Sequence, residues 1–146
     1  MKFVKPVVMC LFLLTVFVVS SSDVLACVKC ATPNFADGKQ RAAAIFVGKV
    51  LSVTEDGDSK IFEFQVSKTW KGSVGKTVKV TYYESLRYQP IYEVGKEYLM
   101  FVESGDDKNL HVYRCSRSAE LVNAADDLKL LGKAKKPKKV KAKGKK

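Results

Sequence analysis

The residues best suited to chemistry are two cysteines that directly follow an apolar leader. Cys27 and Cys30 form a Cys-x-x-Cys motif after Val24-Leu25-Ala26. Small residues at the end of such a leader mark a signal-peptidase site, so we expect cleavage after Ala26 and a mature chain that begins at Cys27. This arrangement indicates that the new N-terminus is held in place and is itself the working part of the protein.

The leader has the three parts of an export signal. Lys2 and Lys5 supply charge, an apolar run extends from Val7 to Val19, and polar residues precede the expected cut. The run is too short to be a membrane span, so we interpret residues 1–26 as a signal peptide and expect a secreted or extracytoplasmic protein. The rest of the chain has room for one small domain, residues 27–132, which we expect to be a monomer.

Three cysteines remain after export, namely Cys27, Cys30 and Cys115, because Cys10 leaves with the leader. Outside the cytosol, thiols that can meet tend to form disulfides, and three thiols leave one over. A second hypothesis accounts for the odd cysteine. Val24-Leu25-Ala26-Cys27 approximates a bacterial lipoprotein signal, in which a diacylglyceryl group on the Cys27 thiol would anchor the protein to a membrane.

Other chemistries of these residues have weaker support. A redox role of Cys-x-x-Cys needs a helix N-terminus behind the first cysteine, and haem attachment needs a histidine after Cys30, where Ala31 stands. His111 and Cys115 face the same way on a strand and could complete a Cys₃His zinc site with Cys27 and Cys30. We favour a disulfide and a buried histidine instead, and expect no metal and no cofactor.

No catalytic constellation is evident, so we expect a protein that is not an enzyme. His111 is the only histidine, which leaves no Ser-His-Asp or Cys-His set with a spare member. The carboxylate pairs Asp106-Asp107 and Asp126-Asp127 are adjacent in sequence, and we interpret them as solvated surface.

The net charge of +11 belongs to a tail. Nine of the 26 Lys and Arg residues follow Gly132 and two lie in the leader, which leaves 15 bases beside 14 acids between Cys27 and Gly132. We expect residues 133–146 to be disordered, because lysine interleaved with small residues cannot bury a core. This segment is either a solubilising extension or a means of binding an anionic cell surface, through Lys133, Lys135, Lys136, Lys138, Lys139, Lys141, Lys143, Lys145 and Lys146.

The sequence pattern of the folded part predicts strands with a helix at each end. A helix is expected over residues 35–43, and a second one from Leu121 to a stop at Gly132. Residues with β-branched, aromatic and alternating patterns predict strands at 45–53, 60–67, 76–83, 97–102 and 109–115, the fourth buried on both faces. Five strands linked by short turns favour an all-β fold, a Greek-key barrel of the OB type, because closure removes exposed edges.

The aromatic residues of these strands are expected in the barrel core rather than on a stacking platform; they are Phe62, Phe64, Tyr82, Tyr83, Tyr98, Phe101 and Tyr113. OB barrels do bind single-stranded nucleic acid through aromatic residues and a basic groove. The leader and the nearly neutral folded part argue against that function, so we expect no nucleic-acid partner.

Taken in order, these segments resemble the N-terminal domain of the tissue inhibitors of metalloproteinases and the wider netrin-like family. The resemblance rests on the two early cysteines, on Pro33 soon after them, and on the strand sequences Ile45-Phe46-Val47-Gly48-Lys49-Val50, Phe62-Glu63-Phe64-Gln65-Val66-Ser67-Lys68-Thr69-Trp70-Lys71-Gly72, Glu97-Tyr98-Leu99-Met100-Phe101-Val102 and Leu110-His111-Val112-Tyr113-Arg114-Cys115-Ser116-Arg117.

The resemblance implies a five-stranded OB barrel with a disulfide from Cys30 to Cys115. It further implies that the α-amine and carbonyl oxygen of Cys27 chelate the catalytic zinc of a metalloprotease, while Val28 enters the enzyme's first pocket. The family has one residue between its first two cysteines, whereas Val28 and Lys29 both stand here. The family's partner for the first cysteine is also missing between Lys76 and Val94, so Cys27 is the odd thiol. The rival hypothesis is a lipid-anchored surface module of the same fold without inhibitory activity.

Overall fold

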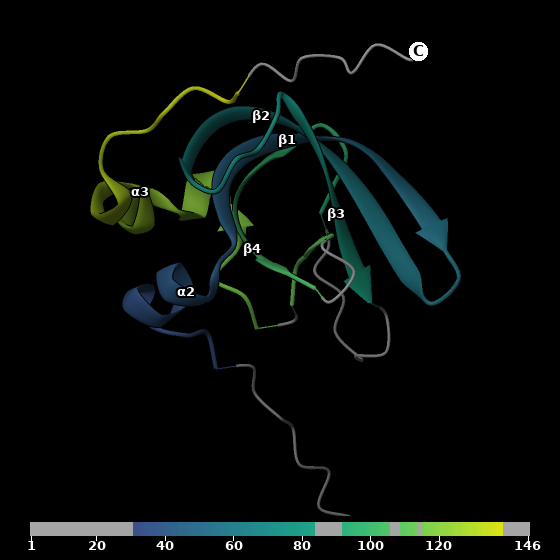
Figure 1. The fold of residues 1–146 in the computed structure, drawn as a ribbon, viewed down its shortest axis with the longest axis horizontal. Coiled ribbons are helices and arrows are strands. Elements are labelled where there is room, and N and C mark those ends of the chain that lie inside the picture. The colour runs from purple at the N-terminus through teal and green to yellow at the C-terminus, as the bar shows by residue number, and fades with distance from the viewer. Residues whose placement is uncertain (1–30, 84–91, 106–108, 114, 139–146) are drawn as a thin grey trace, which may run out of the picture.

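The computed structural model describes residues 31–83, 92–105, 109–113 and 115–138, and these form a mostly β structure. The strands are β1 (Ala44–Asp56), β2 (Ser59–Lys71), β3 (Thr77–Tyr83), β4 (Glu97–Ser104), β5 (Leu110–His111) and β6 (Ala119–Glu120). The helices are α2 (Phe35–Arg41), the 3-10 turn η1 (Leu121–Asn123) and α3 (Ala125–Leu131). Both α-helices lie on the same side of the sheet (Figure 1). Within the described ranges, no helix has the length and apolar character needed to cross a membrane.

Five strands close into a ring. The order is β1-β2-β3-β5-β4, and β4 returns to pair with β1. All neighbours in the ring are antiparallel except β3 and β5, which are parallel. The expected closed set of five strands and the C-terminal helix are thereby confirmed, and closure leaves few strand edges unpaired.

The fifth strand is much shorter than expected. Only Leu110 and His111 belong to it, where they pair with Val80 and Thr81 on one side and with Ser104 and Glu103 on the other. The reason is that β4 has one free edge and two segments share it. Further along that edge, Tyr98 and Leu99 pair with Glu120 and Ala119 of β6, a strand that the sequence did not reveal. The chain therefore leaves β5 early in order to reach β6.

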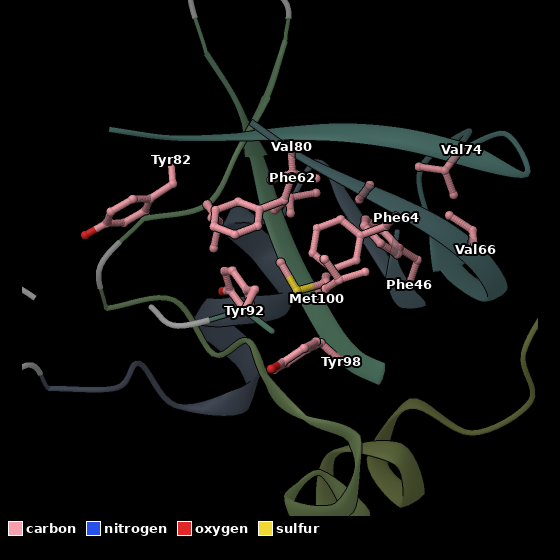
Figure 2. Packing of buried hydrophobic residues seen from close by; sticks show 14 residues of the cluster. Phe46, Phe62, Phe64, Val66, Val74, Val80, Tyr82, Tyr92, Tyr98 and Met100 are labelled. Carbon is pink, nitrogen blue, oxygen red and sulfur yellow. The ribbon is translucent and has the colours of Figure 1, made fainter. Parts of the chain in front are cut away.

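Large apolar side chains fill the interior of the ring, and we call this set the inner core. The expected alternation is confirmed, because Phe62, Phe64 and Val66 of β2 and Val80 and Tyr82 of β3 all point inward. Aromatic rings meet edge to face, with centroids 5.8 Å apart for Phe46 and Phe64 and 5.1 Å apart for Phe62 and Tyr92. Figure 2 shows these rings gathered around Met100. Such packing stabilises the fold by burying apolar area.

A second apolar cluster lies outside the ring, and we call it the outer core. Its buried members are Ala42, Ile45, Val47, Leu99, Phe101 and Ala124, and helix residues such as Phe35, Leu128 and Leu131 pack against it. Successive residues of β4 therefore enter different cores, with Tyr98 and Met100 in the inner core and Leu99 and Phe101 in the outer core. The expected burial of this strand on both faces is confirmed.

The expectation that all seven of these strand aromatics belong to the barrel core is wrong for three of them. Phe101 is buried, but it lies in the outer core, outside the ring. Tyr83 is 49% exposed and Tyr113 is 46% exposed. Tyr83 is the last residue of β3 and points away from the inner core, because Tyr82 takes the inward position. Tyr92 is also an inner-core residue, although it was not among the aromatics expected there. Its hydroxyl is hydrogen-bonded to the side chains of Ser118 and Ser116, and burial raises its pKa above the ordinary value.

Candidate functional site

The expected zinc-chelating end of the chain lies outside the described residues. This applies to Cys27, Val28 and Cys30, and also to Lys139, Lys141, Lys143, Lys145 and Lys146 of the tail. The structure does describe the point at which the N-terminal segment meets the fold, from Ala31 onward, together with Cys115 and the lysines from Lys133 to Lys138. The candidate site is therefore built from the residues that receive the N-terminal segment.

Arg117 joins the N-terminal segment to the C-terminal helix, and we call this contact the arginine clamp. Its Nε and Nη2 atoms donate to the two carboxylate oxygens of Asp127 at 2.8 and 2.7 Å. Its Nη1 atom donates to the carbonyl oxygen of Pro33 at 2.8 Å. Planar, bidentate pairs of this kind are among the stronger polar contacts in proteins. The clamp fixes the chain three residues after Cys30.

Helix α2 begins at once beyond the clamp. Asn34 is its N-cap, and its side-chain oxygen accepts a hydrogen bond from the backbone N–H of Asp37 at 2.9 Å. The guanidinium group of Arg117 lies 5.8 Å from the ring centre of Phe35, within the range of a cation–π contact. Phe35 meets Phe101 of the outer core edge to face, with centroids 6.5 Å apart. Polar and apolar contacts together therefore determine how the N-terminal segment enters the fold.

Cys115 stands two residues before Arg117, on the same short loop. It is half-buried and is not a free thiol. Cys115 is the only cysteine in the described part of the chain, so no disulfide lies wholly within that part. The pairing of Cys30 with Cys115 stays a prediction, because Cys30 lies outside the described residues.

His111 is buried, which agrees with our preference for a buried histidine over a zinc ligand at this position. It is 2% exposed, and its ring stacks on Tyr83 with centroids 5.2 Å apart. Among the residues that the structure describes, no group of three or more His, Cys, Asp and Glu side chains could hold a metal ion. The Cys₃His hypothesis also requires Cys27 and Cys30, which lie outside the described residues.

A small crevice lies beside the clamp, between α2 and the loop that carries Arg117. Its volume is about 10 Å³, and Pro33, Gly38, Phe101 and Ser116 are among its lining residues. A space of that size holds about one water molecule. The crevice is therefore too small for a substrate.

The lysine-rich segment does not match the disorder expected from Lys133. Residues 132–138, which we call the docked segment, run along the edge of β2. Thr69 and Lys135 exchange two backbone hydrogen bonds, at 3.0 and 2.7 Å, and the backbone N–H of Lys138 donates to the carbonyl of Val74 at 3.1 Å. Beyond Gln65, β2 no longer pairs with β3, so this edge has backbone groups free to bond the returning chain.

An open groove separates α2 from the end of β2, next to the docked segment. Its volume is about 640 Å³, and it is lined by Phe35, Ala36, Lys39, Gln40, Trp70 and Lys71. Lys71 Nζ donates to the carbonyl oxygens of Lys39 and Gln40 at 2.8 and 2.9 Å, where a cation complements the C-terminal end of a helix. Trp70 Nε1 donates to the carbonyl of Gly132 at 2.9 Å. The indole therefore connects the groove to the docked segment.

The sequence did not single out either partner of the clamp. The interpretation of Asp126-Asp127 as solvated surface is wrong for Asp127, which is 8% exposed and paired with Arg117. Asp126 does face solvent. A spacing argument could have separated the two, because Asp127 lies one turn from Leu131, and Leu131 packs against the outer core.

No family model matches this chain, and no curated protein matches it. The resemblance to the tissue inhibitors therefore rests on the residues quoted for it, and function must be argued from the geometry of the described residues.

Proposed function

We propose that this chain is an exported, non-enzymatic domain that presents its N-terminal residue to the catalytic zinc of a metalloprotease. The observation that carries the proposal is the arginine clamp. A peptide end that inhibits by chelation must be held still, because ordering it on binding would cost affinity. Arg117 and Asp127 hold the chain at Pro33, a short distance from the expected N-terminus.

The strand order supports the finer assignment to a Greek-key OB barrel. A ring in the order β1-β2-β3-β5-β4, closed by β1 with β4 and containing one parallel pair, is the arrangement that we expect for this fold. The long β1–β2 hairpin fits the same description. We propose that the ring is a netrin-like module of this type.

The clamp also supports the proposed disulfide. Pro33 and Arg117 are in direct contact, while Cys30 lies three residues before Pro33 and Cys115 two residues before Arg117. Three extended residues span about 10 Å, and the Cα atoms of a disulfide are about 5.5 Å apart. Cys30 is thus within reach of Cys115. The bond would leave three residues, Cys27 to Lys29, ahead of the fixed point.

The proposed chemistry uses the backbone of Cys27. An α-amine with a pKa of about 8 is partly neutral near neutral pH, and a neutral amine with the adjacent carbonyl oxygen can form a five-membered chelate on zinc with an open position. Val28 would then enter the first pocket of the enzyme. Inhibition should strengthen as pH rises through about 8, because only the neutral amine has a lone pair for the metal.

The test uses two forms of the mature protein that differ only at the N-terminus. One begins at Cys27, and the matched control carries one extra alanine before it. Both are assayed against a panel of zinc proteases of the thermolysin and metzincin types. We expect the first form to inhibit at least one enzyme, and the extension to weaken inhibition by about 100-fold or more, since it removes the amine from the chelate.

Two further controls make the result specific. Cys27→Ser keeps the amine and removes the thiol, so it should retain inhibition; loss with this variant would mean that the thiolate binds the zinc. Intact mass of the protein from its native host gives the state of Cys27. A free amine without inhibition of any enzyme would contradict the proposal, and a diacylglyceryl group would favour the lipid-anchored module instead.

A further inference from the structure

We propose that the docked segment, the adjoining end of β2 and the groove beside α2 form one cationic face that binds the surface of an anionic lipid bilayer. This function is separate from protease inhibition and does not depend on it. It differs from the action of a loose lysine tail, because part of the segment lies along the folded domain (Figure 1).

Hydrogen bonds to its backbone fix the docked segment at three points. Trp70 holds Gly132 at its start, Thr69 pairs with Lys135 at its middle, and Val74 accepts from Lys138 at its end. The chain is therefore tied to the end of β2 by one isolated antiparallel bridge and to Val74, just beyond β2, by a further hydrogen bond. These bonds hold the backbone that carries the lysines against the folded domain.

The side chains of the docked segment divide into two groups. Ala134 and Pro137 are half-buried against the body of the protein, whereas the four lysines are exposed. Lys68 of β2, beside the bridge residue Thr69, is exposed as well. In the described ranges, no carboxylate lies within 4.0 Å of these five lysines, namely Lys68, Lys133, Lys135, Lys136 and Lys138. Their charge is available to an anionic partner.

The neighbouring groove favours a lipid bilayer over a soluble polyanion as the partner. Its walls include Phe35 and Trp70, flanked by Lys39 and Lys71. Tryptophan prefers the headgroup level of a bilayer, where its ring is in an apolar region and its N–H is near polar groups. A soluble polyanion would gain from the lysines alone, whereas a bilayer also covers the apolar groove. The combination fits a lipid surface.

The test uses the mature chain from Cys27 to Lys146 with Cys27→Ser, which excludes lipidation. Binding is measured by co-sedimentation with phosphatidylcholine vesicles, with and without about one-third phosphatidylglycerol. Trp70 is the only tryptophan in the chain, so its fluorescence reports on this face alone. We expect binding to the anionic vesicles only, a shift of emission to shorter wavelength, and quenching by brominated acyl chains.

A pair of matched variants tests the position of the charges. Lys135→Gln with Lys136→Gln removes two charges from the docked segment, and Lys49→Gln with Lys79→Gln removes two exposed charges from β1 and β3. At about fivefold per lysine near an anionic surface, the first pair should lower the partition coefficient about 25-fold. The second pair should change it by less than about threefold, because those lysines lie off this face.

Three results with vesicles would overturn the proposal. They are the absence of binding to anionic vesicles, binding without any change in Trp70 emission, and equal losses for the two pairs of variants. Binding of soluble polyphosphate as strong as binding to vesicles at equal phosphate concentration would indicate an anionic polymer as the partner, and would also overturn it. Protease inhibition by the same variants should stay unchanged.

Discussion

The inner core and the outer core of this protein are built in different ways. The inner core consists of apolar side chains, among them four aromatic rings that contact one another, Phe46, Phe62, Phe64 and Tyr92. The outer core is smaller, and polar contacts surround it, including the pair of Arg117 with Asp127 and the bond from Trp70 to Gly132. The inner core holds the ring closed, and the outer core attaches both ends of the described chain to the ring.

This difference indicates where function resides. In the part of the chain that the structure describes, packed apolar side chains fill the interior of the ring, and we interpret the ring as a scaffold. Both proposed functions use segments that the outer core holds in place, namely the N-terminal segment and the docked segment. Substitutions in the two cores should therefore have separable effects, on stability in one case and on the chain ends in the other.

The largest effect is expected for Phe64→Ala in the inner core. Phe64 is 0% exposed and touches three aromatic rings, so its loss should lower the free energy of unfolding by about 3 to 5 kcal/mol. Leu128→Ala, on a half-buried outer-core position, should cost about 1 to 2 kcal/mol. Urea unfolding followed by circular dichroism measures both. Equal losses would mean that the two cores do not differ in the way described.

Gly72→Ala should be the next most damaging change. Gly72 has φ +78°, and a Cβ atom there would lie 2.7 Å from the carbonyl oxygen of Ala43, where α2 leads into β1. Gly57→Ala is the matched control, because Gly57 also has a positive φ but has no atom within 4 Å of the added carbon. We expect losses of about 3 and 1 kcal/mol in the free energy of unfolding, respectively. Similar melting temperatures for the two variants would contradict the close contact.

Arg117→Ala tests the clamp. It leaves the Asp127 carboxylate buried without its partner and frees the Pro33 carbonyl, so it should cost about 2 kcal/mol in the free energy of unfolding. Amide hydrogen exchange over residues 35–42 should accelerate, because the segment loses its attachment. Arg41→Ala is the control, since its 3.7 Å contact with Glu103 is solvent-exposed and should contribute under about 0.5 kcal/mol. Unchanged exchange in Arg117→Ala would contradict the clamp.

The smallest effect concerns Tyr92 and high pH. Burial holds the pKa of the folded-state phenol above its ordinary value of 10.0. Above about pH 10 the unfolded chain releases this proton while the folded chain retains it, so the stability present below pH 10 is lost as pH rises further. Tyr92→Phe should lower the free energy of unfolding by about 1 kcal/mol at neutral pH, because the hydrogen bonds of the hydroxyl are lost. Above pH 10, the stability of this variant should decline less steeply than that of the unchanged protein. Parallel curves of urea midpoint against pH for the two proteins would contradict this account.

Much of the sheet could be predicted because strands have a local signature. The alternation of Phe62, Phe64 and Val66 places one face inward whatever the neighbours are. The short turn expected between the first two strands is found, with Gly57 between β1 and β2. Helix α2 and the end of α3 at Gly132 were also expected, since capping and stop residues act within one turn.

Other features could not be predicted because they depend on distant residues. The length of β5 depends on how β4 divides its free edge between two segments. The burial of Asp127 depends on Arg117 and on the return of α3 to the N-terminal segment.

The sequence by itself determined the periodicity of the strands, the positions of the turns and the concentration of charge after Gly132, because each follows from near neighbours in the chain. Only the tertiary structure decided that Pro33 meets Arg117 and that Lys135 pairs with Thr69. These contacts join residues far apart in sequence, and they form when the ring closes and leaves one stretch of β2 unpaired. The attachment of both chain segments is therefore a property of the fold.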